Sequence, residues 1–390
     1  MEKVKLGKYV KIENGYAFKS KNFVENGSPI IRITDLTNNN MNLNTCAKYT
    51  IEDFEKFEKY LVKEGDILIA MSGATTGKIG IVKGIEERIY LNQRIGNFKV
   101  LNDSKLNKTF LYYLVTSQDY QKKIKKIASG CAQQNISSKQ LEGIEVNIPP
   151  LETQKQIVEV LERAEKLKKY REKADNLTED YLKSIFLEMF GDVGKNPKKF
   201  DVVSIKDVVE KTSNENPKNE YPDEYFDYID ISSIDSSIGK ITSSTQYLGN
   251  EASSRARQKI KTNDLLVSTV RPNLNAVGLV PEEFNNQIAS TGFCVLRASE
   301  KISPEYLFLI SRSNYFIESL INQCKGASYP AVNNGDVLNL KIPLPPLELQ
   351  NKFAEIVKRV EEIKKYQKDS KNEIDNLFNN LMQKNFQWKD

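Results

Sequence analysis

The chain has 390 residues, of which 39% are hydrophobic and 28% are charged, and its formal net charge is +5. This length predicts two domains of ordinary size with connecting elements. No apolar run approaches the roughly 18 residues that span a bilayer, and the first residues lack the long apolar stretch of a secretion signal. The sequence contains no histidine, which removes the commonest general base and zinc ligand and argues against intrinsic catalysis.

The four cysteines lack the paired CxxC spacing of zinc and redox motifs. They are Cys46, Cys131, Cys294 and Cys324. This usage predicts a reduced, cytoplasmic protein whose thiols are packed or incidental. The carboxylates show no EF-hand spacing, so we expect no metal site and no cofactor bound by this chain.

Charge is distributed unevenly between the two halves. Residues 1–150 contain 23 Lys and Arg against 16 Asp and Glu, whereas residues 191–346 contain 17 against 19. The first half is therefore typical of a polyanion binder. In the second half acids cluster at 220–235 and bases at 255–271, so a basic patch can coexist with an acidic total. A solvated face is the simpler alternative interpretation of such clusters.

The second half repeats the order of predicted elements in the first. The paired segments are 64–69 with 262–267, 77–82 with 275–280, 91–96 with 287–292 and 110–114 with 306–310. They predict a strand, a second strand after a polar loop, a third strand and then a helix. A glycine-containing polar loop follows in each half, at residues 130 and 326. A repeat of this kind predicts two related mixed domains.

Each half ends in the same motif, which opens a long charged segment. Residues 149–154 read Pro-Pro-Leu-Glu-Thr-Gln and residues 345–350 read Pro-Pro-Leu-Glu-Leu-Gln. Apolar residues then recur at three- and four-residue spacing, which predicts two helices of about 35 residues and about 50 Å each. We expect the two helices to pair as an intramolecular antiparallel coiled coil. An ordinary structural hairpin and a coil that pairs with another chain remain alternatives.

The predicted fold class is α+β. Two mixed α/β domains are separated by a long antiparallel two-helix coiled coil, with an internal pseudo-two-fold repeat. The expected boundaries are 1–148 for the first domain, 149–190 for the first long helix, 191–344 for the second domain and 345–386 for the second long helix.

Residues 73–79 (Gly-Ala-Thr-Thr-Gly-Lys-Ile) approach a nucleotide-binding phosphate loop but do not match it. One residue is missing between the glycines, and isoleucine stands where Ser or Thr must bind magnesium. A loop that touches phosphate through backbone amides and a plain turn are both open interpretations. A dinucleotide-binding GxGxxG and the Asp/Asn-Pro-Pro-aromatic motif of amino-methyltransferases are absent from the sequence.

Polar loops at matching places in the two halves instead indicate a recognition surface. Arginine can pair with guanine and Asn or Gln with adenine, whereas Ser, Thr and Lys mostly contact phosphate. In the first half the candidate DNA-contacting residues are Ser72, Thr75, Thr76, Lys78, Asn92, Gln93, Arg94, Gln133, Gln134 and Asn135. In the second half they are Arg255, Arg257, Ser268, Thr269, Arg271, Asn273, Ser290, Thr291 and Tyr329. Ordinary polar loops on a soluble domain are the alternative.

Taken in order, these features resemble the specificity subunit of a type I restriction–modification system over essentially the whole chain. The resemblance rests on the two modules, each followed by a Pro-Pro-Leu-x-x-Gln-x-x-Ile/Phe helix start, and on residues 65–69 and 91–94. The helix starts imply subunit contacts at Leu151, Gln154, Ile157, Leu347, Gln350 and Phe353. The second half departs from the pattern at residues 289–291, which puts an equivalent of Arg94 in doubt.

The resemblance implies a non-catalytic reader of double-stranded DNA. Each domain would bind one half of a bipartite, asymmetric site, and the coiled coil would set the spacer between the halves. Two adenine-N6 methyltransferase subunits would dock on the helices and bring their own S-adenosylmethionine, and a restriction and translocase subunit is a further, open partner. A coiled-coil scaffold whose modules bind proteins is the main alternative, and a self-sufficient enzyme is the third.

Overall fold

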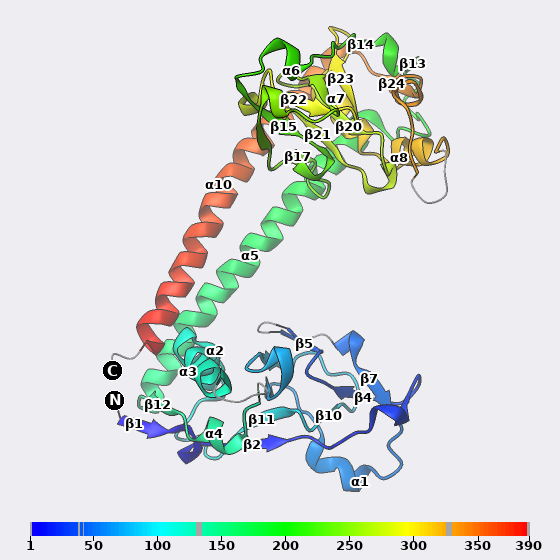
Figure 1. Ribbon diagram of the computed structural model, residues 1–390. Helices are drawn as coiled ribbons and strands as arrows, with labels where there is room; N and C mark the ends of the chain where they lie inside the picture. Colours follow the sequence, from blue (N-terminus) through cyan, green and yellow to red (C-terminus); the bar gives the residue numbers. More distant parts are fainter. Residues whose placement is uncertain (1, 38–39, 42, 130–134, 325–329, 388–390) are drawn as a thin grey trace. The chain divides into compact units, whose positions relative to one another are not determined.

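The computed structural model describes residues 2–37, 40–41, 43–129, 135–324 and 330–387 (Figure 1). These residues form two compact units. Unit 1 comprises Met1–Glu172 with Asp369–Asp390, and unit 2 comprises Lys173–Lys368. Each unit combines helices with β-sheet, so the expectation of two mixed domains is met at this level. No helix in the described ranges is both long and apolar enough to cross a membrane.

The described strands of unit 1 form two four-stranded sheets and two small ribbons. The central sheet has the order β2 (Val10–Asn14), β11 (Ile95–Val100), β8 (Ile67–Ala70) and β9 (Ile79–Ile81), all antiparallel. The second sheet has the order β10 (Tyr90–Leu91), β4 (Ser28–Ile31), β7 (Ala47–Tyr49) and β3 (Phe23–Val24). The ribbons pair β1 (Glu2–Lys5) with β12 (Glu145–Ile148) and β5 (Leu36–Thr37) with β6 (Asn40–Met41). The predicted strands at 64–69 and 77–82 are thus confirmed as β8 and β9.

Helices cover one side of the central sheet of unit 1. They are α2 (Lys108–Thr116), α3 (Gln118–Ser129), α4 (Ser138–Glu142) and the adjoining parts of α5 (Leu151–Phe190) and α10 (Leu347–Phe386). The short helix α1 (Phe54–Phe57) instead packs its Phe57 with Ile30 and Tyr90 of the second sheet. Figure 1 shows α2 and α3 beside the long helices, with α1, β4 and β7 at the opposite end of the unit. The Asn107 side chain caps α2 by accepting the Phe110 amide at 2.9 Å. The Phe386 ring centre lies 5.3 Å from that of Phe110, so the end of α10 packs against this core.

Unit 2 arranges its described strands in a similar order. The larger sheet runs β14 (Val209–Glu210), β23 (Phe293–Ala298), β20 (Leu265–Ser268), β21 (Val277–Leu279), β17 (Lys240–Ile241) and β16 (Ile234–Asp235). The smaller sheet runs β18 (Thr245–Leu248), β15 (Tyr225–Ile229), β22 (Ile288–Ser290) and β19 (Ala256–Lys259). A ribbon pairs β13 (Asp201–Ser204) with β24 (Lys341–Leu344). The antiparallel β23–β20–β21 set corresponds to β11–β8–β9 of unit 1.

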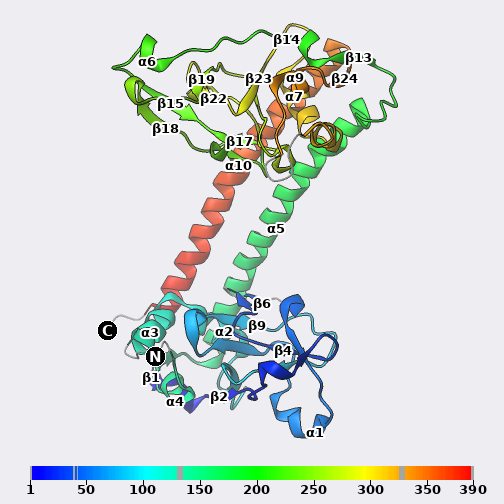
Figure 2. The same ribbon diagram turned by 45° about the vertical axis from the view of Figure 1, so that its right-hand side comes forward.

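The helices of unit 2 are α6 (Pro217–Glu220), α7 (Pro304–Ser311), α8 (Asn314–Ile321) and α9 (Asn334–Leu338), together with the remaining parts of α5 and α10. Figure 2 places α6 and the smaller sheet at one end of the unit and α7 and α9 at the other. The rings of Phe186 and Phe190 of α5 pack against Tyr306 of α7 and Phe353 of α10. This aromatic cluster joins the long helices to the domain core.

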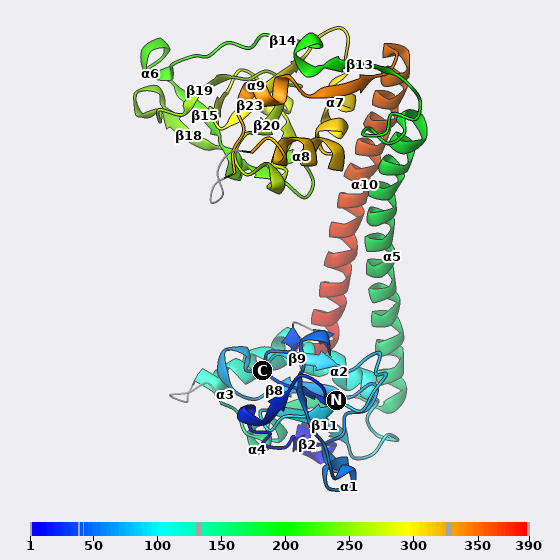
Figure 3. The same ribbon diagram turned by 90° about the vertical axis from the view of Figure 1, so that its right-hand side faces the viewer.

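Within each unit the two long helices run antiparallel. In unit 1 Lys168 of α5 pairs with Asp375 of α10 at 2.7 Å, so an early part of α5 meets a late part of α10. In unit 2 Gln367 of α10 donates to the Thr178 hydroxyl of α5 at 2.8 Å. Figure 3 shows α5 and α10 side by side in a second view. Each helix has 40 residues, against about 35 estimated from the spacing, and its last residue, Phe190 or Phe386, is buried in a domain core.

Candidate nucleic-acid interface

Three loops of unit 1 meet at an open groove of about 960 Å³. They are the β8–β9 loop, the segment before β11 and the segment that leads into α4. The lining residues are Asn14, Met71, Ser72, Gly73, Ala74, Gln93, Arg94, Asn135, Ile136, Ser137, Ser138 and Lys139. Four of them, Ser72, Gln93, Arg94 and Asn135, were predicted from the sequence to contact DNA. Residues as far apart in the chain as Asn14 and Ser138, which are separated by 124 positions, therefore form one polar surface.

Backbone hydrogen bonds hold the three loops together. The Met71 amide donates to the Arg94 carbonyl at 2.9 Å, and the Ile136 amide donates to the Met71 carbonyl at 2.9 Å. Ser72 and Asn135 form an isolated antiparallel bridge beside them. Because these bonds use only main-chain atoms, the groove keeps its shape whatever side chains its rim carries.

Four polar lining residues, Asn14, Ser137, Ser138 and Lys139, were missed by the sequence analysis. The Asn14 side chain donates to the Gln93 carbonyl at 3.3 Å, and Ser138 donates to the Asn14 side-chain oxygen at 2.6 Å. Asn14 thus connects the Gln93 loop to the start of α4. Lys139 adds an exposed positive charge to the rim. The Ser-x-x-Gln capping box at Ser137 was the available signal for a helix start here.

The remaining described residues of unit 1 that were predicted to contact DNA do not line the groove. Asn92 is buried, and its side chain accepts the Arg94 amide at 3.3 Å, so it shapes the loop. Thr76 donates to the Gly73 carbonyl at 2.7 Å, and it lies outside the groove lining together with Thr75 and Lys78. Gln133 and Gln134 lie outside the described residues.

Two hydroxyls of the β8–β9 loop are buried without a hydrogen-bond partner among the described residues. They belong to Ser72 and Thr75. Buried polar atoms in folded proteins are nearly always paired, so such a cluster is typical of a place that water or a ligand completes. The same loop borders the groove, which makes it the part of unit 1 best suited to take up a polar ligand.

Unit 2 repeats this backbone frame. The Thr269 amide donates to the Gly292 carbonyl at 2.9 Å, and the Val332 amide donates to the Thr269 carbonyl at 2.9 Å. Val270 and Ala331 form the matching isolated bridge. Tyr329, which was predicted to contact DNA, lies outside the described residues.

This frame corrects the sequence pairing of the two halves by two residues. The sequence analysis paired 91–96 with 287–292, which places Arg94 opposite Ser290. The hydrogen bonds instead place Arg94 opposite Gly292 and Asn92 opposite Ser290, whose hydroxyl accepts the Gly292 amide at 3.1 Å. A shift of two residues keeps every side chain on the same face of a strand, so apolar alternation alone could not detect it.

Burial also separates the predicted residues of unit 2. Ser268, Thr269 and Ser290, three of the candidates for DNA contact, are buried. Ser268 donates to the Val270 carbonyl at 2.8 Å and Thr269 to the Gly292 carbonyl at 2.9 Å, so both hydroxyls serve the loop. Arg257 is likewise engaged, because it donates to the Ser253 carbonyl at 2.9 Å and to the Ala256 carbonyl. The exposed candidates are Arg255, Arg271, Asn273 and Thr291.

A buried carboxylate anchors the strand that leads into the groove loop of unit 1. Asp66 precedes β8 and accepts hydrogen bonds from the Lys63 amide at 3.1 Å, Asn97 at 2.7 Å and the Lys99 ammonium at 2.9 Å. Lys108 adds an ion pair at 3.3 Å. Burial alone would raise the pKa of Asp66, but these hydrogen bonds outweigh it and hold the pKa below its usual range.

Asp264 has the same position before β20 in unit 2. Its carboxylate accepts the Lys261 amide at 2.7 Å and a two-pronged pair of bonds from Arg297 at 2.8 and 2.7 Å. The strand β20, which leads into the loop with Arg271, is therefore anchored at its start, as β8 is before the loop with Gly73. Both carboxylates are occupied by hydrogen bonds within their own unit. No group of three Cys, Asp or Glu residues in the described ranges could hold a metal ion.

The residues predicted as subunit contacts divide into buried and accessible ones. Gln154, Gln350 and Phe353 are 0% exposed, so their side chains offer no surface to a partner. Ile157 packs against the core of unit 1. Leu347 is the accessible member of the set at 42% exposure, with Leu151 partly exposed. The buried glutamines instead tie each long helix to its own domain, which corrects their predicted role.

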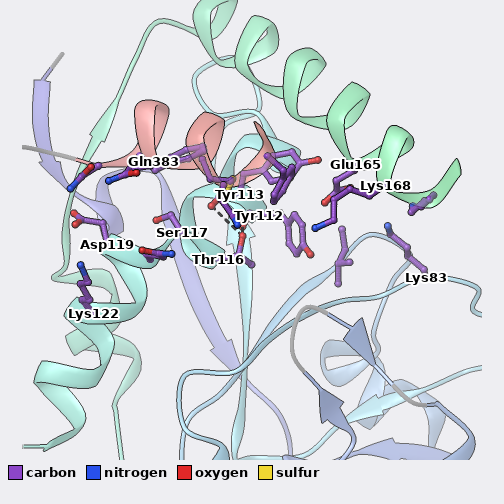
Figure 4. Close-up of a pocket in the computed structure, with 18 of the residues that line it drawn as sticks. Lys83, Tyr112, Tyr113, Thr116, Ser117, Asp119, Lys122, Glu165, Lys168 and Gln383 are labelled. Atoms are coloured by element: carbon purple, nitrogen blue, oxygen red, sulfur yellow. Dashed lines mark hydrogen bonds between the residues drawn. The ribbon is translucent and has the colours of Figure 1, made fainter. Parts of the chain in front are cut away.

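A second cavity, of about 750 Å³, lies in unit 1 between α2–α3 and the long helices. Figure 4 shows Tyr112 and Tyr113 of α2 facing Glu165 and Lys168 of α5, with Gln383 of α10 nearby. Burial, together with the Glu165 carboxylate, raises the pKa of Tyr112 to about 12. Tyr112 therefore stays protonated at neutral pH, and the arrangement resembles a polar helix junction rather than an acid–base site.

Similar proteins share this organisation. A family model described as "Type I restriction modification DNA specificity domain" matches residues 1–176 and again residues 197–376. The chain is similar to the type I restriction enzyme EcoBI specificity subunit of Escherichia coli, with 26% identity over 98% of this chain and 83% of that protein. It is 32% identical to the type I restriction enzyme MjaVIII specificity subunit of Methanocaldococcus jannaschii, but that match spans only 47% of this chain and 44% of the relative.

A solved structure extends the likeness to the whole chain at the level of the fold. The type I restriction–modification S subunit from M. genitalium has a TM-score of 0.55 and 15% identity, covering 100% of this chain and 96% of that one. Since the two family matches together include most of the residues, this chain belongs to the family of the type I restriction modification DNA specificity domain.

Proposed function

We propose that this chain is the DNA sequence-recognition subunit of a type I restriction–modification system. It has no catalytic role of its own, and each unit binds one half of a bipartite, asymmetric site in double-stranded DNA. The observation that carries the proposal is the convergence of three polar loops on one open groove in unit 1. The same backbone frame with different rim side chains in unit 2 is what two different half-sites require.

The chemistry of the rim suits base recognition. Arg94, Gln93 and Asn135 are exposed at the groove, and such side chains can form paired hydrogen bonds with guanine or adenine edges. Lys139 and the backbone amides of the loops suit phosphate. Of the predicted set in unit 2, Arg255, Arg271, Asn273 and Thr291 would contact DNA.

The long helices act as the spacer. We propose that α5 and α10 form one antiparallel coiled coil, which relates the two domains by an internal pseudo-two-fold repeat with the boundaries 1–148, 149–190, 191–344 and 345–386. Forty residues correspond to about 60 Å of helix. That length can separate two readers by roughly one turn of DNA, which advances about 34–36 Å.

Two methyltransferase subunits would dock on the helices and supply S-adenosylmethionine and the methyl transfer to adenine. Apolar side chains on both helices remain exposed in the described chain and suit such partners. They are Val160, Leu167, Tyr170, Leu177, Tyr181 and Leu187 on α5 and Ile363, Tyr366 and Leu377 on α10. A restriction and translocase subunit would join the same assembly. Cytoplasmic localisation accompanies this role.

The decisive experiment measures duplex DNA binding by the chain in complex with its methyltransferase partner at several salt concentrations. We expect affinity to fall steeply as salt rises, because phosphate contacts release counterions. Sequencing of methylated adenines in a host with and without this chain then identifies the target. Salt-independent binding, or a methylation pattern that ignores this chain, would contradict the proposal and favour a protein-binding scaffold.

A further inference from the structure

The two loops that correspond in the two units carry one arginine per unit, but in exchanged positions. In unit 1 the β8–β9 loop has Gly73, and the segment before β11 has Arg94. In unit 2 the β20–β21 loop has Arg271, and the segment before β23 has Gly292. The sequence pairing concealed this exchange, because it set Arg94 against Ser290.

Hydrogen bonds fix both equivalences. Arg94 and Gly292 accept the amides of Met71 and Thr269, each at 2.9 Å. Within the loops, the Gly73 carbonyl accepts the Thr76 amide at 3.0 Å, and the Arg271 carbonyl accepts the Leu274 amide at 2.9 Å. Arg271 therefore stands where unit 1 has Gly73. A short 3-10 turn follows in each loop, at Gly73–Thr75 in unit 1 and, one residue later in this pairing, at Pro272–Leu274 in unit 2.

Arg271 adopts a backbone conformation that favours glycine. Its φ is +49°, whereas φ of Gly73 is +79°. The loop imposes this geometry in both units, because the far ends of the loops also have positive φ, at Gly77 (+88°) and Asn275 (+48°). An arginine in the left-handed region costs stability that a glycine would not. A strained residue that persists at an exposed loop tip is typical of a functional constraint.

We propose that Arg271 and Arg94 are the guanine-reading residues of the two units, each carried by a different loop of the shared backbone frame. The inference rests on the proposed DNA-reading function and assigns its specificity. Arginine is the side chain that pairs with guanine through two parallel hydrogen bonds. Because the two arginines leave the frame at different loops, each unit places its guanine contact at a different point of its half-site.

Arg271→Gly is the sharpest test, since it removes the guanidinium and relaxes the backbone at once. The assay measures adenine methylation of duplex libraries with randomised half-sites by the complex of this chain with its methyltransferase subunits. Discrimination at one guanine of the second half-site should fall about 5- to 150-fold, with the first half-site unchanged. Arg94→Gly should have the reciprocal effect on the first half-site.

Two further variants separate base reading from other causes. Asn275→Gly relaxes the other strained end of the same loop and keeps the arginine, so the preferred sequence should not change. Arg271→Lys keeps the charge without the forked donor geometry, so it should retain overall affinity and lose the guanine preference. An altered preference in Asn275→Gly would mean that loop conformation sets specificity, and would overturn the proposal.

Transplanting the arrangement tests the exchange directly. The double variant Gly73→Arg with Arg94→Gly gives unit 1 the rim of unit 2, and a new Cβ at Gly73 would meet only the Ile33 side chain, at 3.4 Å. We expect the guanine preference in the first half-site to move to another position. The inference fails if Arg271→Gly keeps every base preference. It also fails if the variant lowers methylation of all sequences equally, as the loss of a phosphate contact would. In both cases DNA recognition by the chain would still stand. If even the unaltered chain directs no methylation motif, the proposed function itself fails.

Discussion

Replacing Gln154 by leucine should loosen the attachment of α5 to its domain. The Gln154 side chain is wholly buried and makes three hydrogen bonds to main-chain groups that precede α2 and α5. Its oxygen accepts the Asn107 amide at 2.8 Å, and its nitrogen donates to the carbonyls of Lys105 at 2.9 Å and Pro149 at 2.8 Å. Leucine has a similar volume but satisfies none of these groups.

The expected cost follows from the three orphaned groups. Leaving one buried donor or acceptor unpaired costs about 1–3 kcal/mol. Taking about 1.5 kcal/mol for each of the three groups, and subtracting about 1.5 kcal/mol for the apolar gain of leucine, the local free energy of opening should fall by about 3 kcal/mol. At about 1.4 kcal/mol per tenfold, amide hydrogens in this region should exchange roughly 100-fold faster.

Hydrogen exchange read by mass spectrometry is the suitable assay, because it reports each unit separately. Peptides covering 102–116 should show the faster exchange, and peptides covering 299–312 should not. Gln350→Leu should reverse this pattern, since Gln350 binds the Ser303 amide and the carbonyls of Lys301 and Pro345. Lys155→Leu, at an exposed neighbour, is the control and should change little. Exchange within threefold of the original in Gln154→Leu would refute the reasoning.

Three other substitutions test the frame, the rim and the spacer. Asp66→Asn should lower the free energy of unfolding at pH 7 by about 2 kcal/mol. Because the pKa of Asp66 is depressed in the folded state, the original chain should lose this stability below about pH 4. Acid titration of the variant should not show that loss. Gly15→Ala would place its Cβ 1.9 Å from the Leu91 carbonyl, so thermal unfolding should show destabilisation of about 2–3 kcal/mol and methylation should lose selectivity in the first half-site alone. Inserting seven residues after Glu172 and after Lys368 lengthens each long helix by about 10.5 Å. Methylome sequencing should then reveal a spacer between the half-sites that is about three base pairs longer. An unchanged spacer would show that the helices do not set its length.

The helices and central strands were predictable because their signals are local. The three- and four-residue spacing along α10 and the apolar run of β8 each identify an element without knowledge of its neighbours. The sequence did not show what holds the ends of the long helices. Phe190 and Phe386 are buried in the domain cores, and the core that receives each ring is known only from the fold.

The candidate site was predictable as a set of loops but not residue by residue. Small hydroxyls such as Ser268 and Thr269 can face DNA or bond to their own loop, and the sequence is the same in both cases. The glutamine of the Pro-Pro-Leu-x-x-Gln motif presented the same ambiguity. Gln154 and Gln350 are buried because nearby main-chain groups need partners, a demand that only the folded structure reveals.

Stability and base preference are therefore separable in this fold. The frame of each unit depends on main-chain bonds, on Asp66 or Asp264 and on a buried glutamine. Arg94 and Arg271 enter this frame through their main-chain atoms, because the Arg94 carbonyl accepts the Met71 amide and the Arg271 amide donates to the Pro330 carbonyl. Substitutions of Asp66, Asp264 or the buried glutamines should consequently alter unfolding and leave the recognised sequence intact, whereas replacement of a rim arginine side chain should redirect recognition.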